Sequence, residues 1–118
     1  MLYCEFEAGN NTYKLRLNTR NTVSLEQKLG CNPVMIFGNG DRVPTVTEMV
    51  AILNYSLQAY HHGITMNEAY DIFDNWLDDD HAMTEFIPVI VNIFKVSGLM
   101  KDKKSNTPPE DEDEQEKN

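Results

Sequence analysis

The sequence predicts an α+β domain that is mainly α-helical, with an N-terminal β-hairpin, four to five helices and a disordered acidic C-terminal tail. Three observations predict this. Two short runs near the N-terminus alternate in character, apolar residues further along recur at helical spacing, and the chain beyond residue 100 lacks apolar side chains. We therefore expect one folded domain over residues 1–99 and a disordered tail over residues 100–118. A chain of 118 residues, 41% of them hydrophobic, can bury a core without disulfides or a metal.

The hairpin is predicted from residues 2–7 and 12–17, which alternate in character on either side of Ala8-Gly9-Asn10-Asn11. Glycine and asparagine tolerate the positive φ angles that tight hairpin turns need. A lone hairpin is only marginally stable in water, so we expect one of its faces to pack on the helices that follow.

A short helix and a connector are expected next. Thr22 can cap a helix that Gly30 ends, and Pro33 can precede one further helical turn over residues 34–37. The rest of the connector, up to Pro44, has the glycine and proline content of a loop.

The next two helices begin at capping boxes, Thr45-Val-Thr-Glu48 and Thr65-Met-Asn-Glu68. In this motif the threonine side chain accepts a hydrogen bond from the glutamate amide, and the glutamate side chain accepts one from the threonine amide. We expect Gly63 to end the first of these helices. The expected core residues are Val46, Met49, Val50, Leu53, Leu57 and Tyr60, followed by Met66, Ala69, Tyr70, Phe73, Trp76 and Leu77.

The last helix, from about Thr84 to Ser97, is apolar over a wide arc. Its apolar side chains cover about 220°, whereas a surface helix needs little more than half of that. Either the other helices surround it, or an apolar edge is left for a partner or for another copy of the chain. In the second case we expect the partner-binding residues to be Ile87, Val89, Val91, Phe94 and Val96.

The charge of the chain argues against nucleic acid as a partner. The formal net charge is −9, and residues 1–98 alone hold 12 acidic and 6 basic residues. Phosphate binding needs clustered lysines and arginines. An acidic surface either binds a basic partner or keeps the protein soluble, and we favour the second interpretation.

No constellation of residues in the sequence points to catalysis, a metal or a cofactor. His61 and His62 are adjacent, so on a helix their side chains diverge, and we interpret them as residues favoured at a helix C-terminus. The run of aspartates over residues 78–80 lacks the ligand spacing of a calcium loop. Gly38 and Gly40 lack the rest of a phosphate-binding motif. We therefore expect a protein that is not an enzyme and needs no cofactor.

The sequence also predicts a cytoplasmic protein without a membrane contact. It shows no hydrophobic leader and no apolar stretch long enough to span a bilayer. Its two cysteines, Cys4 and Cys31, are interpreted as buried free thiols, as is usual in an intracellular helical chain.

Several segments together carry a resemblance to a known family. They are residues 13–30, Gln58-Ala-Tyr-His-His-Gly-Ile-Thr65, Tyr70-Asp-Ile-Phe-Asp74, Phe86-Ile-Pro-Val-Ile90 and residues 93–99. With the acidic tail, this order resembles the tail assembly chaperones of long-tailed, siphovirus-type phages and prophages of Gram-positive bacteria. The likeness covers residues 3–99.

The resemblance implies a small protein of the host bacterial cytoplasm that binds the tape measure protein and keeps it soluble. It also implies that the tail tube protein assembles around this client with the chaperone's help, and that the chaperone is absent from the mature virion. A longer form of the chaperone, made by a programmed ribosomal frameshift, is a further implied partner. The resemblance does not fix which residues contact the client.

Two other functions remain open. The chain could be an acidic regulator or inhibitor that binds a basic host protein, or a minor structural component of the virion. Quantifying the protein in purified particles separates the chaperone from the structural component, because the chaperone should be absent there.

The frameshift can be tested. Glu116-Lys117-Asn118 can be encoded by GAA-AAA-AAC or GAA-AAA-AAU, which contain a heptamer on which both tRNAs can re-pair one base back. Lys103-Lys104 is a weaker alternative. We expect a minor, longer product that shares residues 1–117, and mass spectrometry of phage-producing cells should detect a peptide across the junction. A gene that reads GAG-AAG at Glu116-Lys117 would exclude a shift at this position.

Overall fold

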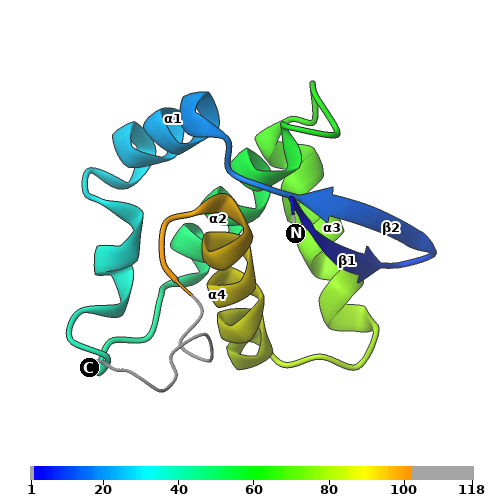
Figure 1. Cartoon of the computed structure of the whole chain (residues 1–118). Helices are drawn as coiled ribbons and strands as arrows, with labels where there is room; N and C mark the ends of the chain where they lie inside the picture. The colour runs from blue at the N-terminus through cyan, green and yellow to red at the C-terminus, as the bar shows by residue number, and fades with distance from the viewer. Residues whose placement is uncertain (1, 102–118) are drawn as a thin grey trace, which may run out of the picture.

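The computed structural model describes residues 2–101 and places a β-hairpin against a group of helices (Figure 1). The elements follow in the order β1 (Cys4–Ala8), β2 (Asn11–Leu15), α1 (Thr19–Leu29), η1 (Pro33–Phe37), α2 (Val46–Leu57), α3 (Met66–Asp78), η2 (Met83–Glu85) and α4 (Phe86–Ser97), where η denotes a short 3₁₀ helix. The predicted fold class, α+β and mainly α, is confirmed. The predicted tail lies outside the described residues from position 102 on, and Met100 packs against the core.

The hairpin forms at the predicted place, with β1 and β2 antiparallel and Ala8 paired with Asn11. Gly9 takes the turn with a φ of 62°, a value at which a side chain would be strained. Its N–H donates to Oδ2 of Asp79 at 2.8 Å, so the turn is tied to the end of α3.

The hairpin packs on the helices through one face, as expected. Phe6 is buried, and its ring centroid lies 5.8 Å from those of Trp76 and Phe86. Phe73 joins the same aromatic cluster, 5.2 Å from Phe86. The hairpin thereby gains the apolar burial that two strands alone cannot provide.

Both predicted capping boxes are confirmed at the start of α2 and of α3. α1 begins earlier than predicted, with Asn18 rather than Thr22 as its N-cap. The side chain of Asn18 accepts a hydrogen bond from the amide of Asn21 at 2.8 Å, which satisfies a donor that the first helical turn leaves free.

α2 ends at Leu57, well before the predicted stop at Gly63. The side chain of Gln58 explains the early end, because it organises the following segment. Its amide nitrogen donates to the carbonyl oxygens of Asn54 and Ile64, at 3.1 and 2.8 Å, and its oxygen accepts from the N–H of Gly63 at 3.1 Å. These bonds hold the segment between α2 and α3 in place.

α2 is the central helix of the fold. Eight of its twelve residues are buried, among them Ile52, Asn54 and Ser56, which lie outside the predicted apolar stripe. α1, α3, α4 and β2 all pack against it. Two residues of the predicted stripe, Val46 and Tyr60, are 41% and 42% exposed. The other helices therefore surround α2 and not the last helix, α4, which buries only four of its twelve residues.

The link between β2 and α1 joins the C-terminal ends of two helices. The backbone N–H of Arg16 donates to the carbonyl oxygen of Ser56 in α2 at 2.9 Å, and its guanidinium donates to the carbonyl oxygen of Val96 in α4 at 2.9 Å. The N–H of Leu17 donates to Oγ of Ser97 at 2.8 Å. We call this set of bonds the Arg16 clasp. A cation at the last turn of α4 also lies at the negative end of the helix dipole.

Replacing Arg16 by methionine should destabilise the protein by about 1–3 kcal/mol, because the carbonyls of Val96 and Leu2 each lose a charged donor. Urea denaturation of the full chain measures this. The matched control is Arg20→Met, since Arg20 is exposed and its side chain has no hydrogen bond or ion pair within residues 2–101. Equal stability of the two variants would show that the clasp contributes little.

Candidate functional site

The predicted partner-binding residues lie on the two sides of α4. Phe94 is the exception, because it is fully buried and its ring centroid lies 6.1 Å from that of Phe37. We therefore assign Phe94 to the core and remove it from the predicted contact residues. The four that remain are half-buried, and we call them the α4 flanks: Ile87 and Val91 on one side, Val89 and Val96 on the other.

The four flank residues differ in whether they pack against the hydrophobic core. Ile87 and Val89 pack against the core, whereas Val91 and Val96 are half-buried without belonging to the side chains that do. An exposed strip that includes Asn92 separates the two flanks. Val91 and Val96 are thus the flank residues that can contact a partner without any change in the fold.

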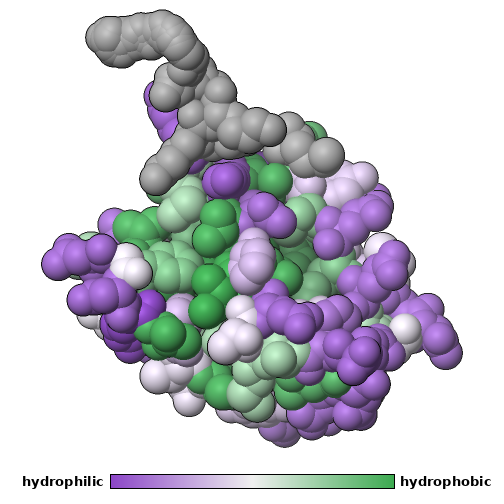
Figure 2. Space-filling view, turned by 90° about the horizontal axis from the view of Figure 1, so that it is seen from below, coloured by the Kyte–Doolittle hydropathy of each residue, from purple (hydrophilic) through white to green (hydrophobic). Residues whose placement is uncertain are grey.

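Hydrophobic residues also gather in the middle of the face shown in Figure 2, which views the molecule from below. η1 and the start of α4 lie on this side in Figure 1. Met35 of η1 is 58% exposed and Met83 of η2 is 43% exposed. The right-hand side of Figure 2, where Figure 1 places the hairpin and α3, is mostly hydrophilic. The apolar surface near α4 is therefore bordered by a polar one.

Two of the three histidines, His61 and His81, make contacts that support the fold. His61 lies beyond the end of α2, where its Nε2 accepts a hydrogen bond from the backbone N–H of Lys14 at 2.9 Å, and its ring lies 5.2 Å from that of Tyr13. His81 stacks on Trp76 with ring centroids 4.4 Å apart. His61 follows the last residue of α2, Leu57, and its N–H donates to the carbonyl oxygen of Leu57 at 2.7 Å. Burial, and then the charge of Lys14, lower the pKa of His61 below its usual value.

No group of three or more metal-ligating side chains comes together within residues 2–101. Asp79, from the run of aspartates, is engaged with the hairpin turn through Gly9. Asp80 adopts a φ of 71°, which reverses the chain after α3. Asp79 therefore holds the hairpin turn, and Asp80 belongs to the turn that follows α3.

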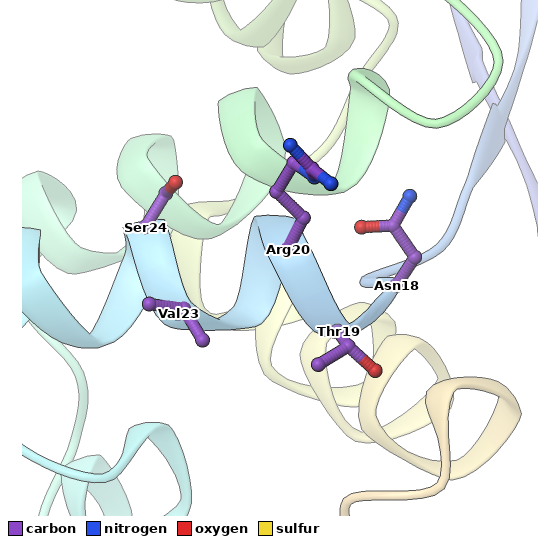
Figure 3. Close-up of a pocket in the computed structure, with 5 residues that line it drawn as sticks. All are labelled: Asn18, Thr19, Arg20, Val23 and Ser24. Atoms are coloured by element: carbon purple, nitrogen blue, oxygen red, sulfur yellow. The ribbon is translucent and has the colours of Figure 1, made fainter.

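A hollow of about 640 Å³ opens beside the first turns of α1 (Figure 3). It is lined by Asn18, Thr19, Arg20, Val23 and Ser24. Thr19 and Val23 point to one side of the helix and Arg20 and Ser24 to the other. All five come from one stretch of chain, so the hollow does not bring reactive groups from different elements together.

Both cysteines are free thiols. Cys4, the first residue of β1, is half-buried, and burial raises the pKa of its thiol to about 11. Cys31 is exposed, which differs from the predicted burial, because it follows the last turn of α1. Within the described residues, none of the helices is both long and apolar enough to span a membrane.

The chain belongs to the family of unknown function DUF6096, whose family model matches residues 5–116. The match includes the hairpin except for Cys4, and every helix within residues 2–101. No curated protein and no solved structure matches the chain.

The bond between His61 and Lys14 predicts a pH-dependent stability. The neutral imidazole accepts this bond, and the protonated ring cannot. Because the folded state lowers the pKa of His61, its contribution is present above the unfolded value near 6.5 and is lost as the pH falls below it. The thermal midpoint should therefore drop between about pH 7 and pH 5.

His61→Gln should flatten this dependence, since the glutamine oxygen can accept the same hydrogen bond and does not titrate. Thermal denaturation across the pH range measures the effect. His62→Gln is the control, because His62 is the exposed neighbour and should leave the dependence unchanged. A pH profile that is the same in all three proteins would contradict this role of His61.

Proposed function

We propose that this protein is a phage tail assembly chaperone, which binds the tape measure protein and promotes assembly of the tail tube around it. The α4 flanks are the observation that carries the proposal, together with the resemblance over residues 3–99. Valine and isoleucine side chains on both sides of one helix offer apolar contact to a helical client.

The chemistry of the client fits such a surface. A tape measure protein is a long helical chain whose apolar faces would aggregate if they were left in water. A chaperone for it needs a half-exposed apolar surface on a body that stays soluble. The α4 flanks supply the first, and a net charge of −9 supplies the second.

The flanks also fit a contact that is released later. Val91 and Val96 are half-covered in the free protein, so each exposes little apolar area before the client arrives. A modest contact area favours reversible binding, which a factor that leaves before the tail is complete requires. In this proposal the protein acts in the host cytoplasm and is absent from the mature virion.

Val91→Asp and Val96→Asp should each weaken client binding by about tenfold, because a charge would be buried against an apolar helix. The measurement is the soluble fraction of the tape measure protein from the same phage or prophage, co-expressed with each variant. Circular dichroism should remain native, since neither side chain belongs to the core.

The matched control is Val43→Asp, which makes the same change at a valine that is 61% exposed in the loop before α2. This variant should solubilise the client as well as the unchanged protein does. If all three variants behave alike, the α4 flanks are not the client site. If the unchanged protein does not solubilise the client, the proposed function fails.

A further inference from the structure

The outer edge of β1 has free backbone hydrogen-bonding groups. Glu5 of β1 lies opposite Lys14 of β2 in the hairpin. The N–H of Lys14 points away from β1, because it donates to Nε2 of His61. Residues of an antiparallel pair alternate between those that bond across the ladder and those that point away from it. Glu5 and Glu7 therefore direct their N–H and C=O groups away from β2, and none of these groups has a partner within residues 2–101.

The outer edge of β2, by contrast, is closed by the end of α2. His61 accepts from the outward N–H of Lys14, and the carbonyl oxygen of Ser56 accepts from that of Arg16 at 2.9 Å. A further strand could not pair there without breaking both bonds. Of the two edges in the described part of the chain, only that of β1 can accept another strand.

Apart from Lys14 of β2, which lies opposite Glu5, the surroundings of the β1 edge are acidic. The carboxylates of Glu5 and Glu7 are exposed, and α3, which packs against β1, exposes Asp71, Asp74 and Asp78. Neither β1 nor α3 contains a lysine or an arginine. This is the mostly hydrophilic right-hand side of Figure 2.

The charges decide which kind of strand fits. A second copy pairing its β1 antiparallel about Phe6 would set Glu5 of one chain opposite Glu7 of the other, twice over. Like charges directly opposite each other destabilise a strand pair, whereas opposite charges stabilise it. A strand with basic side chains at every second position would instead place them opposite both glutamates.

We propose that the β1 edge is a docking site for an extended basic segment of a partner protein, which adds to the hairpin as a third strand. Main-chain bonds to Glu5 and Glu7 hold the segment, and its alternating lysines or arginines face the two carboxylates. The site lies on the hairpin and not on the α4 flanks, so it does not depend on the proposed chaperone function.

The test uses the full chain, labelled with ¹⁵N, and a synthetic peptide of about eight residues, a usual strand length, that alternates lysine and valine. Binding should slow hydrogen exchange at the amides of Glu5 and Glu7 by about tenfold or more, while the amide of Lys14 is unaffected. The matched peptide with glutamate in place of lysine should not bind. No protection at millimolar concentrations of the lysine peptide, or equal binding of the two peptides, would overturn the proposal.

Two proline variants separate strand addition from simple charge attraction. Glu7→Pro removes an outward N–H without removing a bond of the hairpin, and Thr12→Pro does the same on the opposite edge. Glu7→Pro should lose the peptide and Thr12→Pro should retain it. Glu7→Gln, which keeps the N–H, should weaken binding severalfold. Equal binding by the two proline variants, or protection of Glu5 and Glu7 that grows with protein concentration without peptide, would overturn the proposal in favour of charge attraction or self-association.

Discussion

The hydrogen bonds of Arg16 hold the hairpin, α2 and α4 in one arrangement, and the other features of the protein depend on that arrangement. One residue bonds to the last turn of α4 through its side chain and to the end of α2 through its backbone. Within residues 2–101, α4 is the last helix. The clasp fixes its C-terminal end, and Phe86 fixes its N-terminal end in the aromatic cluster. The positions of the α4 flanks and of the free β1 edge follow from these two anchors.

Local sequence signals predicted the boundaries of most elements because those signals act within a few residues. The two capping boxes, the hairpin turn at Gly9 and the glycine at the end of α1 are of this kind. Where the prediction of a boundary was wrong, a side chain supplied a competing bond. Asn18 caps α1 before Thr22 can, and Gln58 takes up the backbone groups that a longer α2 would use.

Which helix lies at the centre of the fold could not be predicted from the width of the arc that its apolar side chains cover. α2 buries polar side chains that its pattern assigns to solvent: Ser56 donates to the carbonyl of Leu53 at 3.0 Å, and Asn54 accepts from Gln58 at 3.1 Å. These bonds satisfy the polar groups inside the domain. α4 shows the opposite case, because four of its apolar side chains remain half-exposed.

Of the five predicted contact residues only Phe94 is core, and its burial depends on Phe37, a distant residue in the sequence. The roles of Arg16, His61 and Asp79 could not be predicted for the same reason. Each looks like an ordinary solvated side chain in the sequence, because its hydrogen-bond partner is distant along the chain.

The thiol of Cys4, in the hairpin, and that of Cys31, after α1, differ in exposure, so their reactivities can report the opening of the hairpin. Cys31 is exposed and accessible to a maleimide reagent, whereas Cys4 is half-buried, burial raises the pKa of its thiol to about 11, and its Sγ lies 3.9 Å from the carbonyl oxygen of Leu15. Since the thiolate is the form that reacts with maleimide, the folded hairpin slows the modification of Cys4, and separation of the hairpin speeds it. The ratio of modification at the two positions is therefore a measure of how often β1 leaves the domain, obtained from the natural sequence without an added label.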